Sequence, residues 1–428
     1  MAGESYSDAN SYLAALTERS VLPEGFTCGT VSIDFKAPEL GSDRSFPLDI
    51  SALLLDEPSS SFGATLTRNR FPGAPVQLAR RRLSLPNTRG VLINNKVANV
   101  YAPGGIDAAG RLLQCLGQLV GAEEEQLFCA STGVIGWGLP VEEMITALPS
   151  LNEKLSSGSA AGVARAIMTT DAYPKLRSAS VGRGRIVGLA KGAGMIEPNM
   201  ATLLVFILTD LAVDRDLLRH QLTRAVNLSF NRISIDGDQS TSDMVLAFSS
   251  GKVPATSMDE FEGALVKVCM ELAEDVVRNG EGTSHVLRLL VREAMSEETA
   301  LGVGKAVINS PLVKTAIYGN DPNIGRIIMA IGDFLGNADH SIDTDRVEIQ
   351  IGGQEVFANG AFRLGGEKEK EIAAYLRSVA LDPDGKSFPP HDLTVDIVIG
   401  LGQGDESAEV LGSDLTYEYV RENAEYRT

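Results

Sequence analysis

The chain is poor in cysteine and has no long apolar run, and each shortage argues against a class of protein. Its four cysteines form no CxxC pair, which favours free thiols in a reducing compartment over a disulfide framework or a zinc site. No apolar stretch reaches the length of about 18 residues that a membrane span needs. The first residues lack the basic and then apolar order of a signal peptide. We therefore expect a cytoplasmic protein.

Positive charge is also scarce. The 428 residues contain 38 lysines and arginines against 56 aspartates and glutamates, a net charge of −18. Nucleic acids and anionic membranes bind basic surfaces, so we expect neither as a partner. Arg80-Arg81-Arg82 is the only basic cluster, and we interpret it as a solvated helix face or a local salt-bridge site. Because no Walker A sequence or correctly spaced glycine triplet is present, we expect no nucleotide site.

Two kinds of segment follow one another along the chain. Some are short and either wholly apolar or alternately apolar and polar, and the others are longer and amphipathic. Short apolar runs are typical of buried strands, and a spacing of three to four residues between apolar positions is typical of helices. We therefore predict an α/β fold with mixed sheets, in two or three domains or one large layered domain. The expected strands are residues 91–93, 203–208, 347–351, 354–357 and 394–399, and the expected helices begin near Asp107 (as cap), Asp214 and Asp259.

The most informative segment runs from Lys191 to Leu204, KGAGMIEPNMATLL. Thr202 follows a glycine-rich approach and stands next to the apolar run. If the Ala201–Thr202 bond breaks, Thr202 gains an α-amine with a reference pKa of about 7.7–8.0 beside its own hydroxyl. An N-terminal threonine then carries its own general base and becomes an activated nucleophile. Alone, such a segment could equally be a turn that enters a buried strand.

Several motifs in order resemble the self-cleaving ornithine acetyltransferase (glutamate N-acetyltransferase) family of arginine biosynthesis. In that family the nucleophile motif reads KGxGMIxPNMATML, which differs here at Leu203. The resemblance extends from about residue 20 to the last residue. The other matching segments are Ser131–Gly136, Met168–Asp171, Asp236–Asp243, Arg278–Thr283, Ile317–Arg326 and Asp414–Thr428.

The resemblance implies a role for each matching residue. Thr202 would be the nucleophile, and cleavage between Ala201 and Thr202 would create it. The Thr132 hydroxyl and the Gly133 N–H would form the oxyanion hole, where glycine also lets the backbone approach the reacting centre. The residues implied in substrate binding are Thr169 (or its neighbour Thr170), Lys191, Thr202, Glu281, Asn423 and Thr428.

The resemblance also implies a fold and a reaction. The fold would be a layered α/β/β/α sandwich in the style of N-terminal-nucleophile hydrolases. Residues 1–201 and 202–428 would be an α and a β chain that stay associated, as α2β2. The enzyme would move an acetyl group from N-acetylornithine to glutamate by a ping-pong mechanism, without a metal or organic cofactor. Some relatives also accept acetyl-CoA.

One loop departs from the family pattern. The family reads INSGNANAxTG where this chain has Ile93 to Gly104, INNKVANVYAPG, so that Lys96 replaces a glycine. If this loop lines the substrate pocket, the acceptor or the acyl donor has changed. Three alternatives stay open: an acyltransferase with a changed amino-acid substrate, an N-terminal-threonine aminopeptidase or amidohydrolase of related fold, and an uncut, non-catalytic protein that keeps the fold.

Overall fold

The computed structural model describes residues 6–41, 45–197, 203–255, 257–338, 340–381 and 393–425. These residues form two compact units. The larger unit consists of Asn10–Asn231 and Asp238–Val276, and the smaller unit of Arg232–Gly237 and Val277–Thr428 with the N-terminal Met1–Ala9. The larger unit is built around two sheets, and the smaller unit is built around one.

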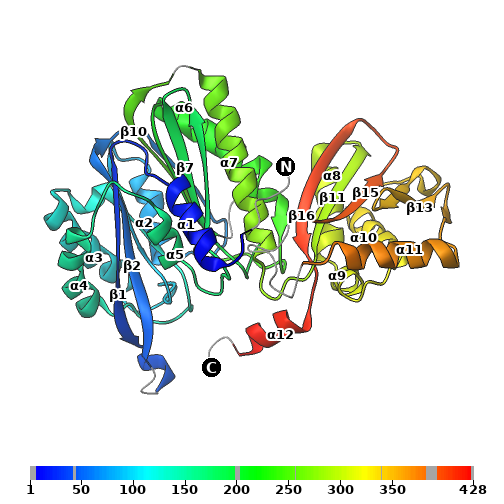
Figure 1. The fold of residues 1–428 in the computed structure, drawn as a ribbon, viewed down its shortest axis with the longest axis horizontal. Helices are drawn as coiled ribbons and strands as arrows, with labels where there is room; N and C mark the ends of the chain where they lie inside the picture. Colours follow the sequence, from blue (N-terminus) through cyan, green and yellow to red (C-terminus); the bar gives the residue numbers. More distant parts are fainter. Residues whose placement is uncertain are drawn as a thin grey trace. The chain divides into compact units, whose positions relative to one another are not determined.

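The larger unit contains two sheets (Figure 1). The first sheet has the strand order β1 (Phe26–Lys36), β2 (Ser45–Ser59), β4 (Thr88–Asn94) and β5 (Leu127–Ser131). Within it, β1 pairs antiparallel with β2, β2 antiparallel with β4, and β4 parallel with β5. The second sheet has the strand order β3 (Phe62–Leu66), β10 (Met244–Pro254), β8 (Leu204–Ala212), β7 (Gly184–Lys191) and β6 (Lys175–Val181). Its central strand β8 lies between β10, which is parallel to it, and β7, which is antiparallel.

Helices cover the outer faces of these two sheets. Helices α3 (Gly105–Val120) and α4 (Val141–Glu153) pack on the first sheet, and α6 (Arg215–Leu228) and α7 (Met258–Arg278) pack on the second. Between the sheets, Phe128 packs against Phe62 and Phe248, with ring centroids 5.8 and 6.0 Å away. The predicted α/β/β/α fold class is therefore confirmed. The remaining helices of this unit are α1 (Ala9–Arg19), α2 (Ala74–Arg82) and α5 (Ala161–Ala166), with short 3-10 turns at Pro38–Leu40, Glu124–Gln126 and Phe230–Arg232.

The smaller unit contains one seven-stranded sheet packed against helices around a single apolar cluster. Its strand order is β14 (Ala361–Phe362), β13 (Gln354–Ala358), β12 (Glu348–Ile351), β15 (Val395–Gly400), β11 (Val286–Ala294), β16 (Glu406–Ser413) and β9 (Ile233–Ser234). The helices are α8 (Glu297–Asn309), α9 (Pro311–Tyr318), α10 (Ile324–Asn337), α11 (Gly366–Ser378) and α12 (Tyr417–Ala424), with a 3-10 turn at Thr344–Arg346. Within the described ranges, no helix of either unit has both the length and the apolar character that crossing a bilayer requires.

Most of the expected elements are confirmed, with one correction at a helix end. Strand β8 is buried at every position except its last residue, Ala212, as its unbroken apolar run predicts. Asp214 caps α6 by accepting hydrogen bonds from two backbone N–H groups. The prediction that Asp107 caps its helix is wrong: α3 starts at Gly105 after Gly104, whose φ of 68° suits only glycine well, and Asp107 lies in the first turn.

The basic cluster lies in the last turn of α2. Arg82 is buried, forms an ion pair with Glu124 and donates a hydrogen bond to the carbonyl oxygen of Leu127. Arg80 donates to the carbonyl oxygen of Thr67 at 2.8 Å. The cluster is thus a local salt-bridge and packing site, as interpreted from the sequence.

Candidate active site

Thr132 and Gly133 lie directly after strand β5, where the sequence predicts an oxyanion hole. The Thr132 N–H donates to the carbonyl oxygen of Asn94 at 3.1 Å, and the Ser131 hydroxyl donates to the Asn94 side-chain oxygen at 2.7 Å. Asn94 therefore fixes this turn from the neighbouring strand. Neither the Thr132 hydroxyl nor the Gly133 N–H has an acceptor among the described residues. Two adjacent residues thus each keep a donor without a partner in this part of the chain, and an oxyanion hole requires donors of this kind.

Gly133 approaches the loop at Lys96 so closely that no side chain fits. A Cβ atom on Gly133 would lie 2.0 Å from the Lys96 carbonyl carbon, and its φ is 133°. The Val134 N–H donates to the Lys96 carbonyl oxygen at 2.9 Å, and the Ala98 N–H donates to that of Val134 at 3.1 Å. The loop at Lys96, which departs from the family pattern, is therefore packed directly against the predicted oxyanion residues.

Asn95 connects this loop to the predicted substrate-binding threonine. Its side-chain amide donates to the carbonyl oxygens of Ala166 at 2.9 Å and Met168 at 3.3 Å. Met168 precedes Thr169, whose N–H donates to a carboxylate oxygen of Asp171 at 3.0 Å. The structure thus brings the Thr169 segment to the same loop that holds Thr132 and Gly133. Thr169 is half-buried, whereas Thr170 is exposed.

Asp171 links the Thr169 segment to the predicted substrate lysine. Its carboxylate accepts a hydrogen bond from the Gly192 N–H at 2.9 Å, directly after Lys191, and forms an ion pair with Lys175. Burial favours the neutral acid, but the charges of Lys175 and Lys191 and these hydrogen bonds outweigh it, so the pKa of Asp171 lies well below its usual range. Asp171 therefore acts as the fixed anion between Thr169 and Lys191.

We expect Asp171→Asn to destabilise the fold strongly, because it leaves the fully buried Lys175 without its counterion. Breaking a buried pair in this way typically costs about 3–5 kcal/mol. As a matched control, Glu142→Gln removes half of the exposed Arg111–Glu142 pair and should change little. Thermal unfolding midpoints of the three proteins measure the difference, and an equal, small shift in both variants would contradict this account.

The difference in stability between wild type and Asp171→Asn should depend on pH. Since the pKa of Asp171 is lower in the folded than in the unfolded chain, its stabilising effect is complete above about pH 4, the ordinary range of an aspartate. The effect is lost as the pH falls through the folded pKa. The gap between wild type and Asp171→Asn should therefore narrow in strong acid.

Asp243 is a second buried carboxyl group, at the start of strand β10. Its backbone carbonyl oxygen accepts from the Thr67 N–H at 3.0 Å. The residue is 3% exposed, and one of its carboxylate oxygens has no hydrogen-bond partner in the described part of the chain. Burial raises the pKa of Asp243 well above its usual range, although Ser240 and the charge of Lys191 oppose the shift. Sequence reasoning missed this group. Its place at the end of the Asp236-to-Asp243 motif, directly before an apolar strand, was the available signal.

The predicted nucleophile Thr202, with Ala201, lies outside the described residues. The surroundings of the strand that follows it are described. Leu204 pairs with Lys191 on one side and with Met244 on the other, and the Met244 N–H donates to the carbonyl oxygen of Leu203 at 3.1 Å. Lys191, at the end of β7, and Asp243, directly before β10, therefore flank the start of β8.

The remaining predicted substrate residues belong to the smaller unit. Glu281 is buried, and its carboxylate accepts a hydrogen bond from the Asn423 side chain at 2.8 Å. Helix α12, which carries Asn423, is tied to the same turn because the Thr416 hydroxyl donates to the carbonyl oxygen of Gly282 at 2.7 Å. The structure thus brings Glu281 and Asn423 together, whereas Thr428 lies outside the described residues.

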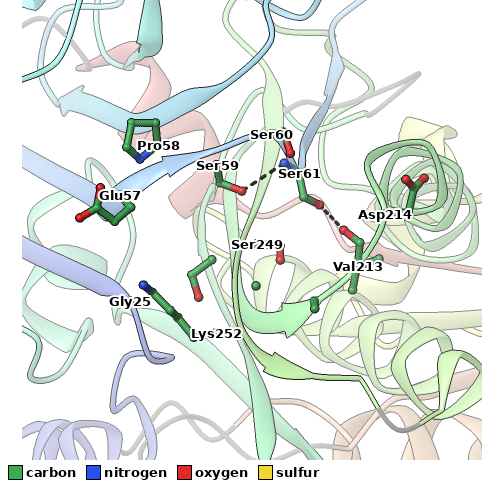
Figure 2. Close-up of a pocket in the computed structure, with 13 residues that line it drawn as sticks. Gly25, Glu57, Pro58, Ser59, Ser60, Ser61, Val213, Asp214, Ser249 and Lys252 are labelled. Atoms are coloured by element: carbon green, nitrogen blue, oxygen red, sulfur yellow. Dashed lines mark hydrogen bonds between the residues drawn. The ribbon is translucent and has the colours of Figure 1, made fainter.

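A cavity of about 450 Å³ lies elsewhere in the larger unit (Figure 2). It is lined by Gly25, by residues 57–61, 212–214 and 249–252, and by none of the predicted site residues. Its hydroxyls bond internally: Ser59 accepts from the Ser61 N–H at 3.1 Å, and the Ser61 hydroxyl donates to the carbonyl oxygen of Val213 at 2.6 Å. The cavity adjoins the carboxyl end of β8, at the opposite end of that strand from Leu203.

Buried charged groups and unpaired hydrogen-bond donors that lie at strand ends of a layered fold are typical of an α/β enzyme.

The ArgJ family model matches residues 35–428. The arginine biosynthesis bifunctional protein ArgJ of Rhodococcoides fascians is 37% identical over 407 residues, which cover 95% of this chain and 94% of that protein. The glutamate N-acetyltransferase Oat2 of Streptomyces clavuligerus is 37% identical over 410 residues, covering 95% and 98%. A crystal structure of ArgJ from Bacillus halodurans is 35% identical, with a TM-score of 0.45, and the match covers 52% of this chain and 98% of that one.

The chain belongs to the ArgJ family. It is an acetyltransferase enzyme of arginine biosynthesis, and the resemblance drawn from its motifs is confirmed.

Proposed function

We propose that this enzyme cleaves itself between Ala201 and Thr202 and then uses Thr202 to move an acetyl group from N-acetylornithine to glutamate. The observation that carries the proposal is the pair of open donors at Thr132 and Gly133, held by Asn94 and the Lys96 loop. An acyl-transfer enzyme needs such donors because negative charge develops on the carbonyl oxygen in the transition state.

The proposed chemistry uses one nucleophile twice. In the uncut chain the Thr202 hydroxyl attacks the Ala201 carbonyl carbon, and the Ala201–Thr202 C–N bond breaks as its nitrogen takes up the hydroxyl proton. This step gives an ester and a free amine on Thr202. Water then hydrolyses the ester, which leaves a carboxylate on residue 201 and restores the Thr202 hydroxyl. In turnover, Thr202 Oγ attacks the acetyl carbonyl, the amide C–N bond breaks, and ornithine leaves with the proton that the α-amine took from the hydroxyl. The glutamate amine then attacks the acetyl ester, the C–O bond breaks, and the Thr202 hydroxyl is restored.

The two fragments, 1–201 and 202–428, would stay associated because both contribute strands to one sheet. Strands β8 and β10 come after the proposed cut, whereas their neighbours β7 and β3 come before it. The pairing of Lys191 with Leu204 crosses the cut directly. We further propose that two such α and β pairs form an α2β2 assembly.

In the proposed reaction Thr169, Lys191, Glu281, Asn423 and Thr428 bind the substrates. An ammonium at Lys191 suits a substrate carboxylate, and the buried carboxylate of Glu281 suits the side-chain ammonium of ornithine. Glutamate as the acceptor is supported by the name of the Streptomyces clavuligerus relative, a glutamate N-acetyltransferase. Acetyl-CoA is a second candidate donor.

We place the enzyme in the cytoplasm, since the four cysteines Cys28, Cys115, Cys129 and Cys269 are free thiols. Burial raises the pKa of Cys28 and Cys129 to about 11 and that of Cys269 to about 12. These thiols therefore stay protonated and unreactive at neutral pH.

Glu281→Gln should raise the Michaelis constant for acetylornithine about ten- to hundredfold, because a charge-assisted contact is worth about 1.5–3 kcal/mol. The loss with acetyl-CoA, if it serves as donor, should be smaller, since that donor has no ornithine ammonium. Glu422→Gln, which removes a neighbouring carboxylate on helix α12, is the matched control and should show no difference between donors. Equal losses with both donors in Glu281→Gln would remove this residue from the substrate site.

A hydrolase with the same type of nucleophile would transfer the acetyl group to water, and an uncut binding protein would transfer no acetyl group. Assaying acetylornithine and acetyl-CoA against glutamate and related amino acids separates these outcomes. The proposed function predicts acetylated amino acid as the product. Free acetate alone would indicate the hydrolase, and an uncut chain without turnover would indicate the binding protein.

A further inference from the structure

Lys96 lies at the place where the predicted oxyanion residues meet the Thr169 segment. Its carbonyl group is in contact with Gly133 and accepts the N–H of Val134, and its neighbour Asn95 donates to the carbonyl oxygen of Met168. A ligand that uses the Thr132 and Gly133 donors would therefore bind next to the backbone of residue 96.

The backbone at Lys96 disfavours a lysine. Its φ is 64°, in the left-handed region that glycine adopts freely and other residues rarely adopt. Asn99 and Tyr101 in the same loop also have positive φ values, of 52° and 53°. Strained positions of this kind cluster at ligand-binding segments, where the surrounding structure holds them in place. The backbone conformation thus favours glycine at residue 96, so the presence of a lysine there must be explained by what its side chain does.

The Lys96 ammonium is available for a ligand. The side chain is half-buried and makes no ion pair or hydrogen bond to the part of the chain that the structure describes. Tyr101 of the same loop is 68% exposed and packs against Phe71, which precedes helix α2 and is 62% exposed, with ring centroids 5.5 Å apart. An ammonium that has no partner among the described residues suits a small anionic substrate.

We infer that Lys96 is a specificity-determining residue that binds a second carboxylate of the substrate, next to the acyl-transfer site. The inference rests on the proposed function, in which Lys191 already serves one carboxylate. The second carboxylate has two candidate sources, the side chain of a dicarboxylic acceptor such as glutamate and the far end of a carboxylate-bearing acyl group such as succinyl.

The test compares wild type with Lys96→Gly, using substrates that differ by one carboxylate. The acceptors are L-glutamate and L-glutamine, and the donors are N-acetylornithine and N-succinylornithine. We expect Lys96→Gly to raise the Michaelis constant for the carboxylate-bearing member of one pair about ten- to hundredfold and to leave its uncharged counterpart nearly unchanged. Which pair responds identifies the source. Lys96→Arg should keep most of the preference.

Stability separates this role from a structural one. Glycine relieves the left-handed strain, so Lys96→Gly should unfold at the same temperature as wild type or higher while it loses affinity. Equal losses with charged and uncharged substrates, or no loss with either pair, would overturn the inference.

The inference can also be tested if acyl transfer itself fails. Calorimetric binding of L-glutamate and N-succinylornithine to wild type and Lys96→Gly does not depend on cleavage or turnover. If no acyl transfer occurs but Lys96→Gly binds either ligand at least about tenfold more weakly than wild type, the proposed function fails and the carboxylate site remains. If both proteins bind both ligands alike, the carboxylate site is refuted.

Discussion

Thr202→Ala is expected to leave the chain in one piece and to abolish acetyl transfer. Alanine lacks the hydroxyl that would attack the Ala201 carbonyl and later carry the acetyl group, so both events require the same atom. Intact-mass measurement of the purified variant should show one uncut chain where wild type shows two fragments. The same preparation should form no N-acetylglutamate from acetylornithine and glutamate.

Thr202→Ser is the matched control, since it keeps a hydroxyl at the same position. It should cut more slowly or less completely and retain part of the transferase activity. If Thr202→Ala kept the wild-type transfer rate, Thr202 would not be the nucleophile. If Thr202→Ala were cut normally but lost its transferase activity, cleavage and acetyl transfer would not depend on the same hydroxyl, which would contradict the shared mechanism.

Thr132→Ala should lower the transfer rate about 10²- to 10³-fold, the typical cost of one lost oxyanion donor. The effect should fall on kcat rather than on the Michaelis constant, because the donor is used only as charge develops on the oxygen. Its backbone contact to Asn94 does not involve the side chain, so the fold should be kept. Steady-state kinetics with acetylornithine and glutamate measure the loss.

Two neighbouring variants make this result specific. Thr132→Ser keeps a hydroxyl and should recover most of the rate. Ser131→Ala removes the adjacent hydroxyl, which bonds to Asn94, and should have a smaller effect on kcat than Thr132→Ala. A Thr132→Ala rate within about threefold of wild type would mean that this turn stabilises no oxyanion.

Local patterns were sufficient to predict the individual elements near the site. The apolar run after Thr202 predicts β8, and the spacing of Phe261, Leu265 and Val268 predicts α7, because burial on one face or on both leaves a direct periodic signal. The Gly352-Gly353 turn likewise predicts the hairpin of β12 and β13. These features depend on residues that are close in sequence.

The division into two units could not be predicted in this way. Strand β9, at residues 233–234, pairs with β16 at residues 411–412, and a pairing over such a separation leaves no local pattern. The roles of Asp171 and Asn95 were hidden for the same reason. Each is an ordinary polar residue in sequence, and its importance comes from partners that the fold brings together, Gly192 for Asp171 and Met168 for Asn95.

Trapping the acetyl-enzyme shows directly whether Thr202 carries the acetyl group. The purified enzyme is mixed with N-acetylornithine without glutamate, quenched in acid, and measured by mass spectrometry. We expect a 202–428 fragment that is heavier by one acetyl group, with the acetyl on Thr202. This added mass should disappear when glutamate is added. An uncut chain that transfers acetyl, or an acetyl group on any other residue, would contradict the proposed mechanism.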